Sequence, residues 1–457
     1  IVLANGENVY PEELETHYSK SPFIKDICIM GISQNGTGPA NEVLHAVVVP
    51  DMDEFRSRRQ TAIMEMIRFE IENLSKQVPS YYRILSLAVR NEPLPRTVTR
   101  KLKRFEIQHE ENERMKAQAQ GVSPASAAVE DDARFRDGAG AVLAKLIRDA
   151  KPECGALNPS LNMELDLGFD SLGRVELLGL AETRLGVHID ENEAARIFTL
   201  GELIDAFEKA RTTHGGPGSG AEAARSWKDI LSDVPDDVLE GHHLFKPRRL
   251  LNPCLFVAMR LVRLAARLTF PMRYYGVEKL PKSLPYVLCP NHESFLDGPF
   301  LVSLLPRKAI YKMCIIGYSD YWKSAFSRRV AEICMIVPID PNVNLIRAMQ
   351  VGAVGLKRGH AMLIFPEGTR TIDGHIAEFK KGAAILAYEL GVPIVPVGIR
   401  GLFEAWPRGG SFRFRPIEYH FGDPIDPRAF AGTADPYTAI TDKLQKDVKK
   451  LSGEDVV

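Results

Sequence analysis

The stretch YVLCPNHESFLD, residues 286–297, places an apolar run directly before a polar turn. The apolar residues 300–302 follow it, so the pattern predicts a buried strand, a turn and then a helix. His292 and Asp297 stand five positions apart across this turn and can be brought side by side. The carboxylate would then fix the imidazole tautomer and leave the other ring nitrogen free to take a proton from a hydroxyl. The stretch therefore predicts a catalytic pair.

Further apolar runs alternate with helical patterns in the same part of the chain, at residues 333–339, 362–365, 394–399 and 417–421. Such alternation is typical of an α/β domain with a central sheet, in which sites gather where strands end. The polar turn FPEGTR, residues 365–370, follows one of these runs. Its glycine allows a close backbone approach, and Arg370 can hold a phosphate through paired hydrogen bonds. Taken alone, each turn is more simply explained as a structural loop.

The composition is that of a globular protein, and 457 residues leave room for about three domains. The net charge of −1 conceals a segregation of charge. Acidic residues outnumber basic ones by seven between residues 130 and 211, whereas basic residues are in excess by eleven from residue 242 onward. The basic part is therefore expected to meet the acidic part or an anionic surface. The six cysteines are scattered, which predicts reduced core thiols and no metal site.

Residues 253–269 are the closest approach to a membrane-spanning segment, but their arginines interrupt it, so no transmembrane helix is expected. Arg260, Arg263 and Arg267 would share one face of a helix, as in helices that lie at a membrane interface. The alternative is an ordinary surface helix that covers a core. The chain begins without Met and without a signal-peptide pattern, so we expect it to be a piece of a longer protein.

The first segment, residues 1–108, is predicted to be a small α+β unit, with strands at 27–32, 44–49 and 84–89 and a helix at 63–74. Two of its motifs, GENVYPEELE (6–15) and PRTVTRKLKR (95–104), resemble those of the C-terminal lid of adenylate-forming ligases such as acyl-CoA synthetases. The resemblance implies that Lys101 contacts the carboxylate and phosphate during adenylation, with ATP bound by a ligase body that this chain lacks. That family usually has Gly before this lysine. Here Arg100 stands there, and a positive φ would cost it steric strain.

Residues 109–129 are predicted to be a linker whose first part is helical, and residues 213–226 a flexible Gly-rich linker. Between them, residues 130–212 predict a bundle of four helices, the last opening with a capping box at 199–202. The motif LGFDSL, residues 167–172, is explained most simply as a helix N-cap. With its acidic flanks and helical layout, however, it resembles an acyl carrier protein. That resemblance implies that a phosphopantetheinyl transferase attaches 4'-phosphopantetheine to Ser171.

Residues 227–457 resemble the glycerolipid (lysophospholipid) acyltransferases, which include the 1-acylglycerol-3-phosphate acyltransferases. NHESFLD matches the HxxxxD motif of that family, FPEGTR its acceptor-phosphate motif, and VPIVPVGI (392–399) its last motif. The resemblance implies that His292 and Asp297 are catalytic and that an acyl group passes from a CoA or acyl-carrier thioester to a lysophospholipid. The second motif of the family often ends in Arg where Pro341 stands here, and Arg347 could substitute for it. The acceptor's polar head would be held by Glu367, Gly368, Thr369 and Arg370.

The sequence therefore predicts a multidomain protein with a small α+β lid, a four-helix carrier bundle and an α/β acyltransferase built on a central mixed sheet. The expected function is O-acyl transfer in phospholipid biosynthesis or remodelling, on the cytoplasmic side at the inner membrane face, with no metal and no nucleic acid. A second hypothesis is an acyl-activating ligase and carrier module, as in a fatty acid–AMP ligase, whose acyltransferase part is secondary. A third is a soluble multidomain scaffold. Acyl chain length, headgroup and donor stay open.

Overall fold

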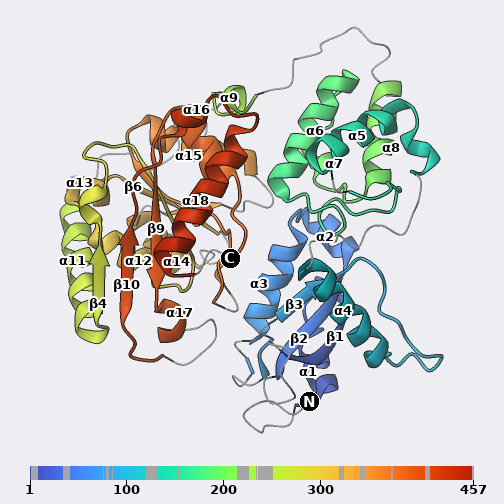
Figure 1. The fold of residues 1–457 in the computed structure, drawn as a ribbon, viewed down its shortest axis with the longest axis horizontal. Coiled ribbons are helices and arrows are strands. Elements are labelled where there is room, and N and C mark those ends of the chain that lie inside the picture. Colours follow the sequence, from blue (N-terminus) through green and yellow to red (C-terminus); the bar gives the residue numbers. More distant parts are fainter. Residues whose placement is uncertain are drawn as a thin grey trace. The chain divides into compact units, whose positions relative to one another are not determined.

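The computed structural model divides the chain into two compact units, Ile1–Arg225 and Ser226–Val457, each described by itself below (Figure 1). Among the described helices, none combines the length and the apolar character that crossing a bilayer requires. The structure describes residues 1, 9–33, 42–75, 77–78, 82–84, 86–119, 131–152, 154–213, 226–232, 234, 251–318, 324–334, 336–339, 345–371, 374–406 and 412–454.

The first unit opens with a three-stranded sheet in the order β1-β2-β3, in which β1 and β2 are antiparallel and β2 and β3 are parallel. The strands predicted at 27–32 and 44–49 and the helix at 63–74 are confirmed, whereas the third strand, predicted at 84–89, begins only at Ser86. The helix α1 begins with Pro11 and has Glu12 and Glu13 in its first turn, where acids favour the helix dipole. The elements are α1 (Pro11–Tyr18), β1 (Ile24–Ser33), β2 (Glu42–Pro50), α2 (Met52–Arg58), α3 (Ile63–Ser75), β3 (Ser86–Val89) and α4 (Arg104–Ala119).

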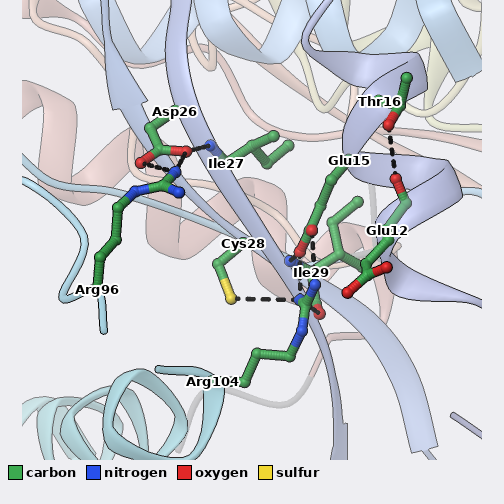
Figure 2. Close-up of polar contacts among 9 residues, drawn as sticks. All are labelled: Glu12, Glu15, Thr16, Asp26, Ile27, Cys28, Ile29, Arg96 and Arg104. Carbon is green, nitrogen blue, oxygen red and sulfur yellow. Dashed lines mark hydrogen bonds and ion pairs between the residues drawn. The ribbon is translucent and has the colours of Figure 1, made fainter. Parts of the chain in front are cut away.

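The basic loop before α4 is held at both ends by ion pairs with the sheet and with α1 (Figure 2). The guanidinium of Arg96 contacts both carboxylate oxygens of Asp26 at 2.7 Å. Arg104 forms a two-pronged pair with Glu15, one contact of which measures 2.7 Å, and also donates to the carbonyl of Ile29 at 3.2 Å. The tip between these anchors is a tight, exposed turn that carries Lys101.

Arg100, at the tip of this loop, has a φ of 63°, which is the left-handed region. Its N–H donates to the carbonyl of Thr97 at 2.8 Å, and its own carbonyl accepts from Arg96 at 2.7 Å, so hydrogen bonds on both sides hold the conformation. The steric cost that the sequence led us to consider at this position is therefore present, because an L residue with a Cβ is disfavoured here.

Replacing Arg100 with glycine is expected to stabilise the first unit by about 1 kcal/mol, because glycine adopts a positive φ without strain. Alanine at the same position is the matched control, since it removes the guanidinium but keeps the Cβ. Chemical denaturation of the full chain, followed by a probe in the first unit, measures the difference. An equal gain in both variants would assign the effect to charge and not to backbone strain.

Residues 131–213 form helices that pack around an apolar cluster including Leu143, Phe169 and Phe207. The capping box at the start of α8 is confirmed, because Thr199 and Glu202 exchange side chain–backbone hydrogen bonds. The first part of the 109–129 segment continues α4 to Ala119, as predicted; residues 120–130 and the Gly-rich segment 214–225 lie outside the described residues. The helices are α5 (Gly138–Ala150), α6 (Ser171–Leu185), α7 (Glu191–Ala194) and α8 (Leu200–Thr213).

A half-buried carboxylate, that of Glu164, links the two parts of this unit. Both oxygens of Glu164 accept from backbone N–H groups at the start of α3, from Ile63 at 2.7 Å and from Met64 at 3.0 Å. These are orphan donors of a helix N-terminus, which favours a negative charge. Arg174, on α6, donates to the carbonyl of Thr61 at 2.9 Å. The residues around α6 therefore contact the segment that leads into α3.

The second unit is built on a seven-stranded mixed sheet in the order β4-β10-β9-β5-β8-β6-β7, as the sequence predicted in outline (Figure 1). The central strand β5 runs parallel to both neighbours, β8 and β9, whereas β10 is antiparallel to β9. The carboxyl ends of β5 and β8 consequently meet at one edge of the sheet. The strands are β4 (Met272–Tyr275), β5 (Val287–Pro290), β6 (Met313–Tyr318), β7 (Ile336–Ile339), β8 (Ala361–Leu363), β9 (Ile394–Arg400) and β10 (Ile417–Phe421).

Helices cover both faces of this sheet, with α11, α12 and α13 on one face and α15, α16 and α18 on the other (Figure 1). The predicted strand at 333–339 is too long: Ile333 ends a helix, and the strand begins only at Ile336. The helices are α9 (Trp227–Ile230), α11 (Leu251–Thr269), α12 (Asp297–Leu304), α13 (Arg307–Tyr311), α14 (Ala325–Ile333), α15 (Leu345–Lys357), α16 (Gly382–Leu390), α17 (Leu402–Ala405) and α18 (Pro436–Ser452).

The helix α11 is amphipathic, as predicted, but two of the three arginines, Arg260 and Arg263, bind groups of the protein, and only Arg267 is exposed. Arg260 turns toward the protein and donates to the carbonyls of Ser303 and Leu305, at the end of α12, at 2.7 and 3.0 Å. Arg263 donates to the hydroxyl of Tyr274. Arg260 is drawn inward because the last carbonyls of a helix need donors. The solvent-facing side is instead apolar, with leucines and a valine that are more than half exposed: Val257, Leu261, Leu264 and Leu268.

Candidate active site

His292 and Asp297 lie side by side, as their spacing predicted. The turn after β5 brings Nδ1 of His292 to 2.7 Å from Oδ2 of Asp297, which is the first residue of α12. The same oxygen accepts from the backbone N–H groups of Glu293 at 2.6 Å and Ser294 at 2.8 Å. The Asp297 side chain is fully buried, whereas the imidazole is 19% exposed. A carboxylate fixed in this way holds the proton on Nδ1 and leaves Nε2 as a proton acceptor.

Two buried polar side chains that the sequence did not single out hold this turn in place. Asn291 pairs with the backbone of Ile399 on β9, accepting from its N–H at 2.7 Å and donating to its carbonyl at 3.0 Å. Glu293 accepts from the N–H of Phe403 at 2.9 Å and receives the amide of Asn291 at 3.2 Å. Their backbone partners, Ile399 and Phe403, lie more than a hundred positions away. The only signal in the sequence is therefore that both residues are polar and directly follow an apolar strand.

The FPEGTR turn follows β8 and meets the turn of His292, as parallel neighbouring strands require. The ring of Phe365 stacks on the imidazole of His292 with 3.8 Å between the centroids. The N–H of Thr371 donates to the carbonyl of His292 at 2.8 Å. Gly368 has a φ of 77° and donates to the carbonyl of Phe365 at 3.0 Å, which explains why a glycine stands in this turn.

Glu367 has a different position from the one that the sequence predicted. Its side chain is buried, with Oε1 accepting from the N–H of His292 at 2.7 Å and Oε2 from the N–H of Ala377 at 3.0 Å. Both carboxyl oxygens are therefore engaged by backbone N–H groups, so the side chain is not available to an acceptor headgroup. The geometry makes Glu367 a residue that positions the His292 turn.

Of the other predicted acceptor-binding residues, Gly368 is exposed and Thr369 is half-buried, so both line the surface of the turn. Arg370 is buried, with its guanidinium carbon 3.5 Å from the ring centroid of Phe295, and its charge lowers the pKa of Asp297. The second-motif position Pro341 lies outside the described residues. Arg347, its suggested substitute, lies exposed on α15.

Burial dominates the electrostatics of the site. It raises the pKa of Asp297 to about 8, although the backbone donors of Ser294 and Glu293 lower it. Burial also raises the pKa of Glu367 to about 8 and that of Glu293 well above its usual range. Lys380, in the segment after FPEGTR, has its pKa lowered to about 8 by burial. Carboxyl groups held in this state favour the neutral form unless a cation or donors stabilise the charge.

The remaining predicted positions lie in the first unit. Ser171 is the first residue of α6, and Asp170 caps this helix by accepting from the N–H of Gly173 at 2.8 Å. Lys101 lies exposed in the turn described above. Cys28, Cys289 and Cys314 are buried free thiols, in keeping with the predicted core role, whereas Cys154 and Cys334 are half-buried and Cys254 is exposed. Within the described ranges, no group of His, Cys, Asp and Glu side chains is arranged to hold a metal ion.

Three family models match successive parts of the chain. A model for the C-terminal domain of AMP-binding enzymes matches residues 1–115, one for the phosphopantetheine attachment site matches residues 141–207, and one for acyltransferases matches residues 271–400. The last match contains both turns of the site described above, and the second contains Ser171.

Several of the similar proteins are acyltransferases. The chloroplastic 1-acyl-sn-glycerol-3-phosphate acyltransferase of Brassica napus is 34% identical over 30% of this chain and 39% of that protein. The 1-acyl-sn-glycerol-3-phosphate acyltransferase of Pseudomonas aeruginosa is 32% identical over 36% of this chain and 61% of that protein. The crystal structure of the 1-acyl-sn-glycerophosphate acyltransferase of Thermotoga maritima aligns at 21% identity and a TM-score of 0.39, over 50% of this chain and 94% of that chain.

The chain spans 39% and 61% of the lengths of these two curated relatives. These relatives therefore resemble only part of this chain. The family models match three successive parts of it. The chain joins a C-terminal domain of the AMP-binding enzymes and a phosphopantetheine attachment domain to an acyltransferase domain like that of the 1-acylglycerol-3-phosphate acyltransferases.

Proposed function

We propose that the second unit transfers a fatty acyl group from a thioester to the free hydroxyl of a lysophospholipid such as 1-acylglycerol-3-phosphate. The observation that carries the proposal is the meeting of two turns at one sheet edge: the His292–Asp297 pair after β5 and the FPEGTR turn after β8. The names of the similar acyltransferases support the choice of acceptor.

In this reaction Nε2 of His292 takes the proton from the acceptor hydroxyl while its oxygen attacks the thioester carbonyl. The carbon–sulfur bond breaks, and the thiolate that leaves takes up the proton that His292 acquired. Asp297 stabilises the imidazolium that forms between these two steps. The acceptor phosphate binds at the surface of the FPEGTR turn, where Gly368 and Thr369 are accessible and Arg370 supplies a cation. Glu367 positions His292 and does not contact the acceptor.

The donor in this proposal is the chain's own carrier domain, with CoA as the alternative. A phosphopantetheinyl transferase attaches 4'-phosphopantetheine to Ser171, where a four-helix carrier bundle presents the N-terminus of α6 and its helix dipole to the phosphodiester. Tethering the thioester to the same chain raises its effective concentration at the acyltransferase. The ligase lid that carries Lys101 belongs, in this proposal, to an ATP-dependent body that loads the carrier.

The experiment offers the full chain, converted to its phosphopantetheinylated form, to a panel of lysophospholipids with either acyl-CoA or acyl groups loaded on the carrier. Mass spectrometry of the lipids identifies the product. Acylation of 1-acylglycerol-3-phosphate is the expected result, and Ser171→Ala is expected to abolish the carrier-dependent reaction while leaving any CoA-dependent reaction intact. If no lysophospholipid in the panel is acylated from either donor, the proposal is wrong.

We also propose that the second unit works on a membrane surface, at the inner face of the cytoplasmic membrane, and that α11 binds lipid through its leucine face. The proposal is supported by the more than half-exposed side chains of Val257, Leu261, Leu264 and Leu268, which recur at the spacing of one helical face. A lysophospholipid partitions into membranes, so an enzyme that uses it gains by lying there.

Changing Leu261 and Leu264 together to aspartate is expected to weaken binding to vesicles of phosphatidylethanolamine and phosphatidylglycerol by about 10- to 100-fold, because two apolar side chains no longer enter the lipid. Leu180→Asp is the matched control, because this leucine is also exposed but lies on α6. Sedimentation with vesicles measures the binding. An equal loss in the control, or no loss in the double variant, would contradict the membrane role of α11.

A further inference from the structure

Two fully buried polar atoms beside the candidate active site have no hydrogen-bond partner within the described part of the chain. One is Oδ1 of Asp297, the carboxylate oxygen that does not face His292. The other is the hydroxyl of Tyr419, on β10. Both side chains are 0% exposed. Buried polar groups in native proteins are nearly always paired, directly or through an ordered water, so each of these atoms calls for a partner.

The strand β10 carries Tyr419 to the same region as the catalytic pair. Tyr419 stands opposite Ile399 in the antiparallel pairing of β10 with β9, and Ile399 is the residue whose backbone binds the side chain of Asn291. Tyr419 belongs to the same apolar cluster as Phe300 and Leu301 of α12, the helix that begins at Asp297. Its side chain therefore enters the sheet face on which α12 lies.

The electrostatics agree with this placement. Burial raises the pKa of Tyr419 well above its usual range, and the charges of Asp297 and Glu293 raise it further. The hydroxyl consequently keeps its proton, and donating that proton in a hydrogen bond to an acceptor would stabilise it. Oδ2 of Asp297 already receives three donors, so Oδ1 is the vacant acceptor of that carboxylate.

We propose that the Tyr419 hydroxyl donates to Oδ1 of Asp297 through one buried water and thereby acts as a positioning residue for the His292–Asp297 pair. A donor on Oδ1 prevents the carboxylate from rotating and keeps Oδ2 directed at Nδ1 of the imidazole. It also favours the ionised form of Asp297, which the pair needs. The rate measurement for this inference rests on the proposed acyl transfer, but the hydrogen bond to Asp297 does not depend on that reaction.

The groups that bear on the titration of Asp297 come from three elements. His292 and Glu293 belong to its own turn, Glu367 and Arg370 follow β8, and Tyr419 is on β10. Removing the Tyr419 hydroxyl takes away one donor to the carboxylate and leaves the other four groups in place. The pKa of Asp297 should then rise, and activity that depends on its carboxylate should begin at higher pH.

The test is Tyr419→Phe in the full-length, phosphopantetheinylated chain, because phenylalanine keeps the ring that fills the core. We expect kcat/KM at pH 7 to fall about tenfold, the acidic limb of its pH profile to move upward, and KM for the acceptor to stay unchanged. Tyr286→Phe is the matched control: its hydroxyl is also buried without a partner in the described residues, but burial alone raises its pKa, to about 12. This variant should behave like wild type.

A second measurement keeps the test independent of the proposed reaction. The proton-dependent nitrogen shifts of the His292 imidazole, recorded by NMR, report its coupling to Asp297 without any substrate. A changed titration in Tyr419→Phe but not in Tyr286→Phe supports the inference even if no lysophospholipid is acylated. Identical titrations and identical pH profiles in wild type and Tyr419→Phe would overturn it, and so would an equal change in both variants.

Discussion

Replacing His292 with alanine is expected to lower kcat/KM for acyl transfer by about 10²- to 10⁴-fold, the usual contribution of a general base. The imidazole is the side chain that the structure holds ready for proton transfer, because Asp297 pairs with Nδ1 at 2.7 Å, which keeps the proton off Nε2, and the ring is partly exposed. Mass spectrometry of the lipid product, with the acyl group offered on the carrier and on CoA, measures the loss for both donors.

The control for this experiment is His375→Ala. His375 lies in the same domain but is largely exposed, and its ring nitrogen pairs with Glu454 at 3.6 Å. This variant should retain the wild-type rate. The His292→Ala chain should still accept phosphopantetheine on Ser171, which shows that the first unit is intact. A His292→Ala chain that acylates lysophospholipid at the wild-type rate would rule out His292 as the base.

The local parts of this site could be predicted from the sequence. The pattern of residues 286–302 predicts the strand, the turn and the helix, and the spacing predicts that His292 and Asp297 meet. The strain at Arg100 was predicted only on the condition that its φ is positive, and the φ is 63°. These predictions succeed because each depends on the conformation of a few consecutive residues.

The parts that could not be predicted depend on register between distant strands. Asn291 is recognisable as a structural residue only once β9 is known to place Ile399 beside it. Tyr419 is placed near the site because β10 pairs antiparallel with β9. The alternation of strands and helices in the sequence does not predict this order of strands. The resemblance of FPEGTR to an acceptor-phosphate motif assigns Glu367 to the acceptor, and nothing in the sequence of this turn indicates that the Glu367 side chain is buried.

The helix α11 shows a further limit of periodicity. The spacing of Arg260 and Arg263 placed them on one face, but it could not say whether that face pointed toward solvent or toward other polar groups of the protein. The carbonyls of Ser303 and Leu305 at the end of α12 decide the matter, because Arg260 donates to both of them. The apolar face of α11 then points to solvent, so a lipid would contact the leucines and not the face of Arg260 and Arg263.

Replacing Asp297 with asparagine is expected to lower kcat/KM by about 10³- to 10⁴-fold, because an amide would donate to Nδ1 and leave the proton on Nε2, the wrong tautomer for a base. In the wild-type chain, kcat/KM should rise with pH through about 8, where burial places the pKa of the Asp297 carboxyl. Only above that pH is the carboxylate fully present to hold the required tautomer. The asparagine variant should lack this rise, which a pH–rate profile of both chains measures.

Although Asp297→Asn should lower activity, it should make the protein more stable relative to wild type as the pH rises. Asp297 has a pKa of 3.8 in the unfolded chain and about 8 in the fold, so the folded state holds the proton more tightly. The stability that this group contributes is fully present below pH 4 and is lost as pH rises through 8. The melting temperature of Asp297→Asn relative to wild type should therefore increase between pH 5 and pH 9.

The control is Asp435→Asn, because that carboxyl caps α18, pairs with Lys381 and has a lowered pKa. Its loss should destabilise the protein by the same amount throughout this range, and a parallel trend in both variants would show that Asp297 is ionised in the fold at every pH tested.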